Sequence, residues 1–96
     1  MIDKPHQINL LLGAARDYQD GLMSLQTLTW KTEGLLNIIE DGALSRQLSD
    51  ALFVLEEINA YTYTADYDFE SEGKPIVDRA VKEIIAKIET HSPRSD

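Results

Sequence analysis

The amino-acid sequence predicts an all-α fold, a four-helix antiparallel bundle formed by a single domain of 96 residues. Three observations support this prediction. Apolar residues recur at intervals of three and four along four segments, which is the spacing of amphipathic helices. Asp-Gly pairs separate the first three segments, and short turns of this kind favour antiparallel neighbours. A chain of this length buries roughly two-thirds of its unfolded surface, so one core is feasible.

The first helix is expected at about residues 5–19 and the second at about residues 24–40. Pro5 suits a first helical turn because it lacks the amide proton that would be unpaired there. Ser24 is a good N-cap for the second helix. Gly34 lies within that helix at a cost of about 1 kcal/mol relative to alanine, which close helix packing or a slight bend would explain. The inner faces comprise Ile8, Leu11, Leu12, Ala15 and Tyr18 in the first helix and Leu25, Leu28, Thr32, Leu35, Leu36 and Ile39 in the second.

The third helix is expected at about residues 43–60 and the fourth at about residues 75–90. Each again has an apolar face, which has to be buried against neighbouring helices. Trp30 and Ile38 lie off the inner face of the second helix, where they either form a second contact surface or widen the core. The apolar faces are Leu44, Leu48, Ala51, Leu52, Leu55 and Ile58, and then Val77, Val81, Ile84, Ile85 and Ile88.

The segment between the third and fourth helices, residues 61–73, interrupts this pattern. It carries three of the four tyrosines, and acidic and aromatic residues alternate from Asp66 to Glu70. A loop of this length is uncommon in a compact domain and is often functional, although Tyr and Thr also favour a short strand or hairpin. No Lys or Arg occurs between Arg46 and Lys74, a window that holds seven acids: Asp50, Glu56, Glu57, Asp66, Asp68, Glu70 and Glu72.

These acids without counter-charges predict a docking surface for a positively charged macromolecule. Their mutual repulsion is a cost that solubility alone does not demand. Tyrosine adds rigid contact area of the kind found in interface hot spots, and carboxylates pair with Lys or Arg on a partner. The alternative is that the tyrosines hold the loop against the helices while the acids face water. The residues predicted to bind the partner are Glu56, Glu57, Tyr61, Tyr63, Asp66, Tyr67, Asp68, Glu70 and Glu72.

Composition limits the class of function. The net charge of −8 disfavours binding to nucleic acid or to anionic lipid. No apolar stretch approaches the roughly 20 residues that a transmembrane helix needs, and the N-terminus does not resemble a signal peptide. The chain has no cysteine, which removes disulfides and cysteine-based zinc sites and fits a reducing compartment. The sequence therefore predicts a cytoplasmic protein that binds neither nucleic acid nor membranes directly.

Catalytic and cofactor chemistry finds little support, so we expect no enzyme, cofactor or metal site. Counted from Asp66, positions six and twelve of an EF-hand loop would be Ser71 and Val77, where glycine and glutamate are needed. His6 and His91 lie near opposite ends of the chain, without a ligand set or a catalytic triad around them. An acyl carrier protein would attach its prosthetic arm to the serine of an Asp-Ser-Leu motif. Ser24 follows Met23 instead of Asp, and helix capping explains it.

Three segments resemble the helical immunity proteins of the colicin D type, which occur beside colicins, related bacteriocins and contact-dependent growth inhibition toxins. Residues 18–24 form a helix end, a glycine turn and a serine cap. Residues 50–61 form a helix that runs into an acidic, tyrosine-containing loop, and residues 76–85 form a closing helix. The likeness extends from about residue 8 to residue 88. The chain departs from the family pattern at Leu28, where an aromatic residue is common.

The resemblance implies a bacteriocin immunity protein, a toxin inhibitor that neutralises its cognate nuclease, commonly one that acts on tRNA. The acidic surface would cover the basic active site of the toxin, and a monomer would bind one toxin domain. This agrees with the independent analysis of charge, because a ribonuclease needs a cationic site to hold RNA. Two alternatives remain open at this point: an acidic adaptor or regulatory protein that binds another basic protein surface, and an acyl-carrier-like protein.

Overall fold

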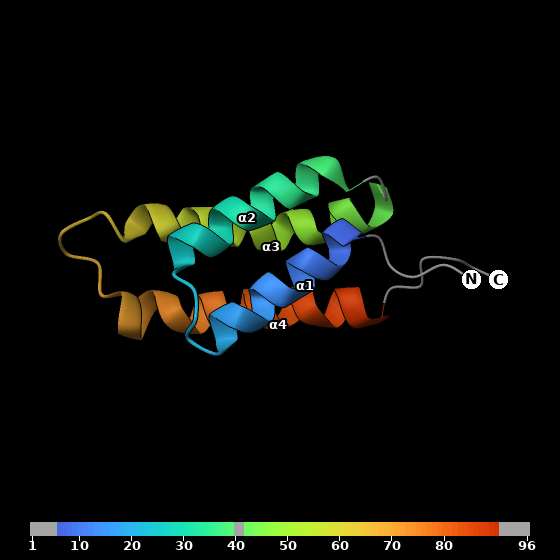
Figure 1. Ribbon diagram of the computed structural model, residues 1–96. Helices are drawn as coiled ribbons and strands as arrows, with labels where there is room; N and C mark the ends of the chain where they lie inside the picture. Colours follow the sequence, from blue (N-terminus) through green and yellow to red (C-terminus); the bar gives the residue numbers. More distant parts are fainter. Residues whose placement is uncertain (1–5, 40–41, 91–96) are drawn as a thin grey trace, which may run out of the picture.

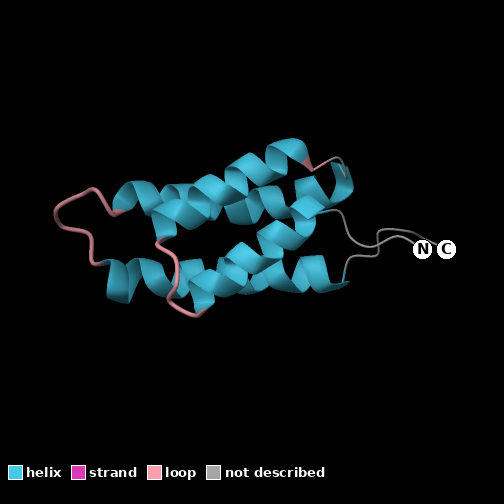
Figure 2. Ribbon diagram, in the orientation of Figure 1, coloured by secondary structure: helices cyan, strands magenta, loops and turns pink. Residues whose placement is uncertain are grey.

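The structure is a computed structural model that describes residues 6–39 and 42–90. Figures 1 and 2 show that these residues are almost entirely helical. No strand occurs in these two ranges, and the predicted all-α class is confirmed. No helix in them is long and apolar enough to cross a membrane. The elements are α1 (His6–Gln19), α2 (Leu25–Ile38), α3 (Gly42–Tyr61), a five-residue π-helical turn η1 (Phe69–Gly73) and α4 (Lys74–Thr90).

The ends of the first two helices follow from local sequence. α1 ends where Gly21 adopts a left-handed backbone with φ of 79°, which lets Gly21 N donate to Tyr18 O and Leu22 N to Asp17 O. Ser24 caps α2, as the sequence predicts, because its Oγ accepts a hydrogen bond of 3.1 Å from Thr27 N. α2 ends at Ile38, before the expected residue 40, because Ile39 adopts an extended backbone. Pro5, the expected start of α1, lies outside the described residues.

The four α-helices pack in a ring, in which each helix contacts two others. α1 lies against α2 and α4, and α3 lies against the same two helices (Figure 1). The residues enclosed between them are mainly Leu, Ile, Val and Ala, and most come from the predicted inner faces. Ala14 and Ala80 are buried although they were not predicted, and the predicted Leu12, Tyr18, Leu35, Leu52 and Ile85 are only partly buried. Trp30 and Ile38, in contrast, are 62% and 55% exposed, so they do not widen the core. The fully buried large side chains include Ile8, Leu11, Leu28, Leu44, Leu48, Leu55, Val77, Val81, Ile84 and Ile88.

Replacing Thr32 by valine is expected to raise the free energy of unfolding by about 1 kcal/mol, measured by urea denaturation. Thr32 is fully buried, and its Oγ1 has no hydrogen-bond partner in the described part of the chain. Valine replaces that hydroxyl with a methyl group of similar size and removes the desolvation cost. Thr29 is the matched control, because its buried Oγ1 donates to Leu25 O at 2.8 Å. Thr29→Val loses this bond and should not stabilise the protein. A loss of stability in Thr32→Val would contradict the prediction.

Candidate functional site

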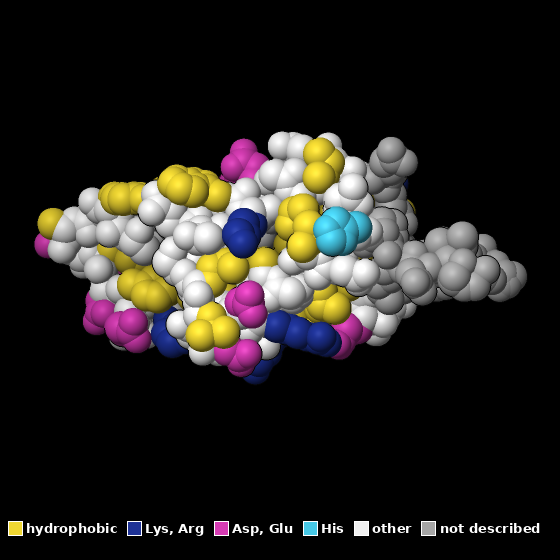
Figure 3. Space-filling model, in the orientation of Figure 1, with side chains coloured by type: hydrophobic (Ala, Val, Ile, Leu, Met, Phe, Trp, Pro, Cys, Tyr) yellow, Lys and Arg dark blue, Asp and Glu magenta, His cyan; other side chains and the backbone are white. Residues whose placement is uncertain are grey.

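The residues predicted to bind a partner lie at one end of the molecule. They occupy the last two turns of α3, the turn at residues 62–68 and η1, which follow one another at the left of Figure 1. In Figure 3, some acidic side chains lie at this end of the visible face, and others lie at its top and along its lower edge. We call this region the acidic end. It comprises Glu56, Glu57, Tyr61, Tyr63, Asp66, Tyr67, Asp68, Glu70 and Glu72.

The connection between α3 and α4 is more regular than the sequence predicts. Tyr61 is the last residue of α3 and η1 leads directly into α4, so only residues 62–68 are irregular. The hydroxyls of Thr62 and Thr64 each donate to a backbone carbonyl three residues earlier, at 2.6 Å. Such local hydrogen bonds supply partners for the backbone of a turn, and they compete with the hydrogen bonds that paired β-strands would form. The short strand or hairpin considered from the Tyr and Thr content therefore does not form.

Asp68 caps η1 and is not a freely placed surface acid. Its Oδ2 accepts a hydrogen bond of 2.7 Å from Ser71 Oγ, and its Oδ1 accepts one of 3.4 Å from Ser71 N. The bonds from the Ser71 side chain and backbone lower the pKa of the Asp68 carboxyl below its ordinary value. The acid thus orders the segment that carries Glu70 and Glu72.

Acidification is expected to loosen η1 only below the ordinary pKa of an aspartate. Because the pKa of Asp68 is lower in the folded than in the unfolded chain, its contribution to stability is present above the unfolded value. That contribution is lost as the pH falls through the lowered value. An NMR titration that follows the Asp68 carboxyl carbon and the Ser71 amide measures this midpoint. Ser71→Ala should move the midpoint upward, whereas a wild-type midpoint at or above the ordinary pKa would refute the capping role.

Tyr67 folds back onto the helices. It is half-buried against the core, and its ring centroid lies 5.4 Å from that of Tyr61 at an interplanar angle of 37°. Its hydroxyl lies over Gly73, where an added Cβ would come within 2.6 Å of it. Partial burial raises the pKa of the Tyr67 hydroxyl, and Glu72, Tyr61 and Glu57 raise it further. Tyr67 therefore helps to hold the turn in place, so part of its area is unavailable to a partner.

Tyr61 and Tyr63 present more surface than Tyr67, with exposed fractions of 44% and 69%. Tyr63 also borders a hollow of about 410 Å³ between the start of α2 and the end of α3. Its uncharged lining suits the apolar stem of a long side chain such as Arg or Lys. Most of its lining was not predicted, because three segments that are separate in the sequence form it. The lining residues are Ser24, Leu25, Gln26, Asn59, Thr62, Tyr63 and Phe69.

The carboxylates of the acidic end lack basic partners in the described ranges, although Asp68 is hydrogen-bonded to Ser71. None of them forms an ion pair with a basic residue within residues 6–39 and 42–90. The negative potential is therefore not cancelled locally, and it would attract and orient a cationic protein. The ion pairs that the described residues do form are Arg16–Glu89, Lys74–Asp78 and Lys87–Glu83.

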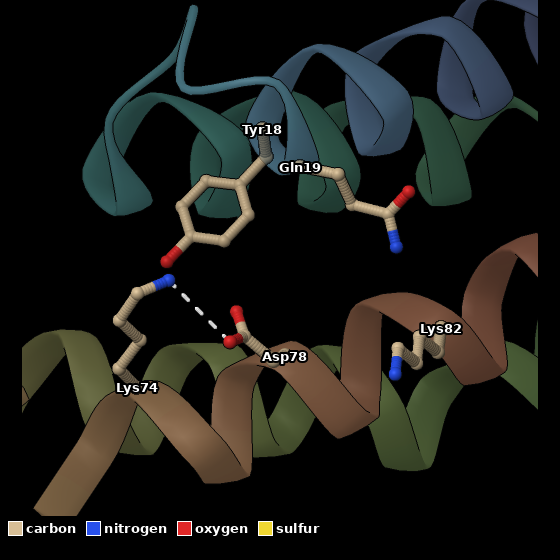
Figure 4. A pocket seen from close by; sticks show the side chains of 5 residues that line it. All are labelled: Tyr18, Gln19, Lys74, Asp78 and Lys82. Carbon is tan, nitrogen blue, oxygen red and sulfur yellow. Dashed lines mark hydrogen bonds and ion pairs between the residues drawn. The ribbon is translucent and has the colours of Figure 1, made fainter. Parts of the chain in front are cut away.

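The basic residue nearest in sequence to η1 is already paired. Lys74 begins α4, and its Nζ lies 3.4 Å from Asp78 Oδ2 (Figure 4). Both residues line a polar pocket of about 240 Å³ between α1 and α4, together with Tyr18, Gln19 and Lys82. Partial burial raises the pKa of the Tyr18 hydroxyl, and the nearby charges of Asp78 and Glu70 raise it further. The pocket therefore lies next to the acidic end.

The described residues contain no group of three His, Asp or Glu side chains placed to hold a metal ion. His6 is exposed at the start of α1, and His91 lies outside the described residues. The Ser24 side chain is engaged in the cap of α2. Comparison of the chain with protein-family models, characterised proteins and solved structures found no match.

Proposed function

We propose that this protein is an immunity protein, a four-helix antiparallel bundle that binds a basic toxin domain through its acidic end and neutralises it. The observation that carries the proposal is the set of carboxylates in the turn and η1 that no basic residue of the described chain pairs with. The resemblance of the sequence to helical immunity proteins of the colicin D type supports the same conclusion. The action is binding, with no catalytic step and no cofactor.

The chemistry of a ribonuclease explains how such a surface would inhibit it. A nuclease that acts on tRNA holds its substrate by placing Lys and Arg around the phosphates. Asp66, Glu70 and Glu72 would occupy positions that phosphates take in the RNA complex, while Tyr63 and the hollow beside it would hold a basic side chain. Electrostatic attraction would accelerate association, and buried aromatic contact would slow dissociation. One monomer in the bacterial cytoplasm would thereby cover one toxin domain.

Replacing both Asp66 and Glu70 by lysine is expected to weaken toxin binding by roughly tenfold or more and to remove protection of the cell. The variant leaves Asp68 intact because that residue caps η1. The partner is the basic domain captured from the source cell or encoded by the neighbouring reading frame. Affinity is measured by calorimetry, protection by survival of cells that express the toxin, and helix content by circular dichroism. For the wild-type complex, added salt should slow association.

A matched control distinguishes the effect of where the acids lie from the effect of the total charge. Glu33 and Asp50 are exposed acids on α2 and α3, away from the turn. Replacing both by lysine changes the net charge from −8 to −4, as does the first pair, because each substitution replaces −1 by +1. Only the first pair should impair protection. Equal effects of the two pairs, or no effect of the first, would show that the acidic end is not the inhibitory surface. Binding of a basic protein without protection from a toxin would identify an adaptor instead.

A further inference from the structure

A second surface lies along α1 and α2, outside the acidic end. Leu10, Lys31, Gly34 and Leu35 line a groove of about 330 Å³, which we call the α1–α2 groove. On α2, Trp30 lies one helical turn before Gly34 and Ile38 one turn after it, and both are exposed. Figure 3 shows hydrophobic patches over these two helices. An exposed tryptophan near a surface hollow is typical of the hot spots of protein–protein interfaces.

The packing of residues 6–39 and 42–90 does not explain Gly34. The sequence suggested close helix packing, yet an added Cβ at Gly34 would meet no atom of these residues within 4 Å. A helical glycine costs about 1 kcal/mol relative to alanine, and no neighbouring helix requires it here. Because Gly34 has no side chain, the α1–α2 groove remains open at this position. The position is therefore suited to receive a side chain from another molecule.

Lys31 adds charge to the edge of this groove. It is exposed and forms no ion pair with any described residue. Residues three or four positions apart on a helix can form ion pairs. For Lys31 these positions hold Thr27, Leu28, Gly34 and Leu35, so no acid on α2 is placed to form such a pair with it. An apolar hollow beside an unpaired cation is complementary to a ligand that carries an apolar group next to a carboxylate.

We infer that the α1–α2 groove binds an acidic amphipathic helix of a partner protein. A large apolar side chain of that helix lies over Gly34, and a carboxylate about one turn away pairs with Lys31. A groove between two helices accepts a third helix along its length, and the described residues offer no strand edge for an extended peptide. This interaction is independent of the proposed toxin binding.

The test is selection of helical peptides from a displayed amphipathic library against the full chain. We expect enriched peptides to carry a Leu- or Phe-rich face flanked by Glu or Asp. Because Trp30 is the only tryptophan, its emission should shift to shorter wavelength when such a peptide binds. Gly34→Leu should weaken binding of the selected peptide by about tenfold or more because it fills the groove. Lys31→Glu should reverse the preference, so that peptides with Lys in place of Glu bind better.

Gly13→Leu is the matched control for the groove variant. Gly13 is also an exposed glycine within a helix with open space around it, and it does not line the α1–α2 groove. It should leave peptide affinity unchanged. The inference is overturned by any of four results: no enriched peptide, enrichment without acidic residues, affinity unaffected by Gly34→Leu, or Gly13→Leu acting as strongly as Gly34→Leu. Concentration-dependent dimerisation that Trp30→Ala abolishes, or flotation with phosphatidylglycerol vesicles, would identify a different occupant and overturn it as well.

Discussion

Replacing Leu55 by alanine is expected to lower the free energy of unfolding by about 2–5 kcal/mol. Leu55 lies in α3, where its side chain is fully buried in the core shared by the four helices. Alanine removes apolar contacts and leaves a cavity that neighbouring helices can close only in part. A domain of this size is stabilised by about 5–15 kcal/mol in total, so the loss is a large fraction of its stability. Urea denaturation should show an earlier midpoint.

Phe53 gives the control for this prediction on the same helix. Phe53 is larger than Leu55, but its side chain is 64% exposed. Phe53→Ala should therefore change the free energy of unfolding by no more than about 0.5 kcal/mol. A cost for Phe53→Ala as large as that for Leu55→Ala would mean that α3 presents a different face to the core.

Replacing Gly73 by alanine is expected to lower the free energy of unfolding by about 1–3 kcal/mol. Its Cβ would lie 2.6 Å from the Tyr67 hydroxyl oxygen, 2.9 Å from Ile58 Cγ2 and 2.9 Å from Phe69 Cδ1. These separations are too short, so the two rings and the isoleucine have to move. Because Tyr67 holds the turn against the helices, partner binding at the acidic end should weaken together with stability. Thermal denaturation and the toxin-binding assay measure the two effects.

Two further variants show whether the close approach is the cause. Tyr67→Phe removes the nearest atom, so the double variant with Gly73→Ala should recover part of the lost stability. Gly13→Ala introduces the same methyl group into open space on α1, where it should stabilise the helix by up to about 1 kcal/mol. A stable Gly73→Ala protein with an unchanged Tyr67 environment by NMR would contradict the proposed contact.

The elements of the fold were accessible from sequence because their causes are local. The period of apolar residues places Leu28, Leu48 and Ile84 on inner faces, and all three are fully buried. The turn at Gly21 and the cap at Ser24 depend on neighbouring backbone groups, so residue type alone indicates where α1 stops and α2 starts. The concentration of acids between α3 and α4 is likewise visible in the sequence, since those residues are close along the chain.

What only the tertiary structure decided concerns atoms brought together from distant segments. Periodicity could not tell whether Trp30 widens the core or faces outward, because that depends on how α1 and α3 approach α2. The open space at Gly34, the contact between Tyr67 and Gly73, and the hollow beside Tyr63 also depend on distances between separate elements. Helical hydrogen bonds and the periodicity of apolar residues depend on residues that are close in the sequence, whereas close packing brings together residues that are far apart in it. The sequence alone therefore determined which segments are helical and where charge accumulates, and helix packing decided which side chains remain free for a partner.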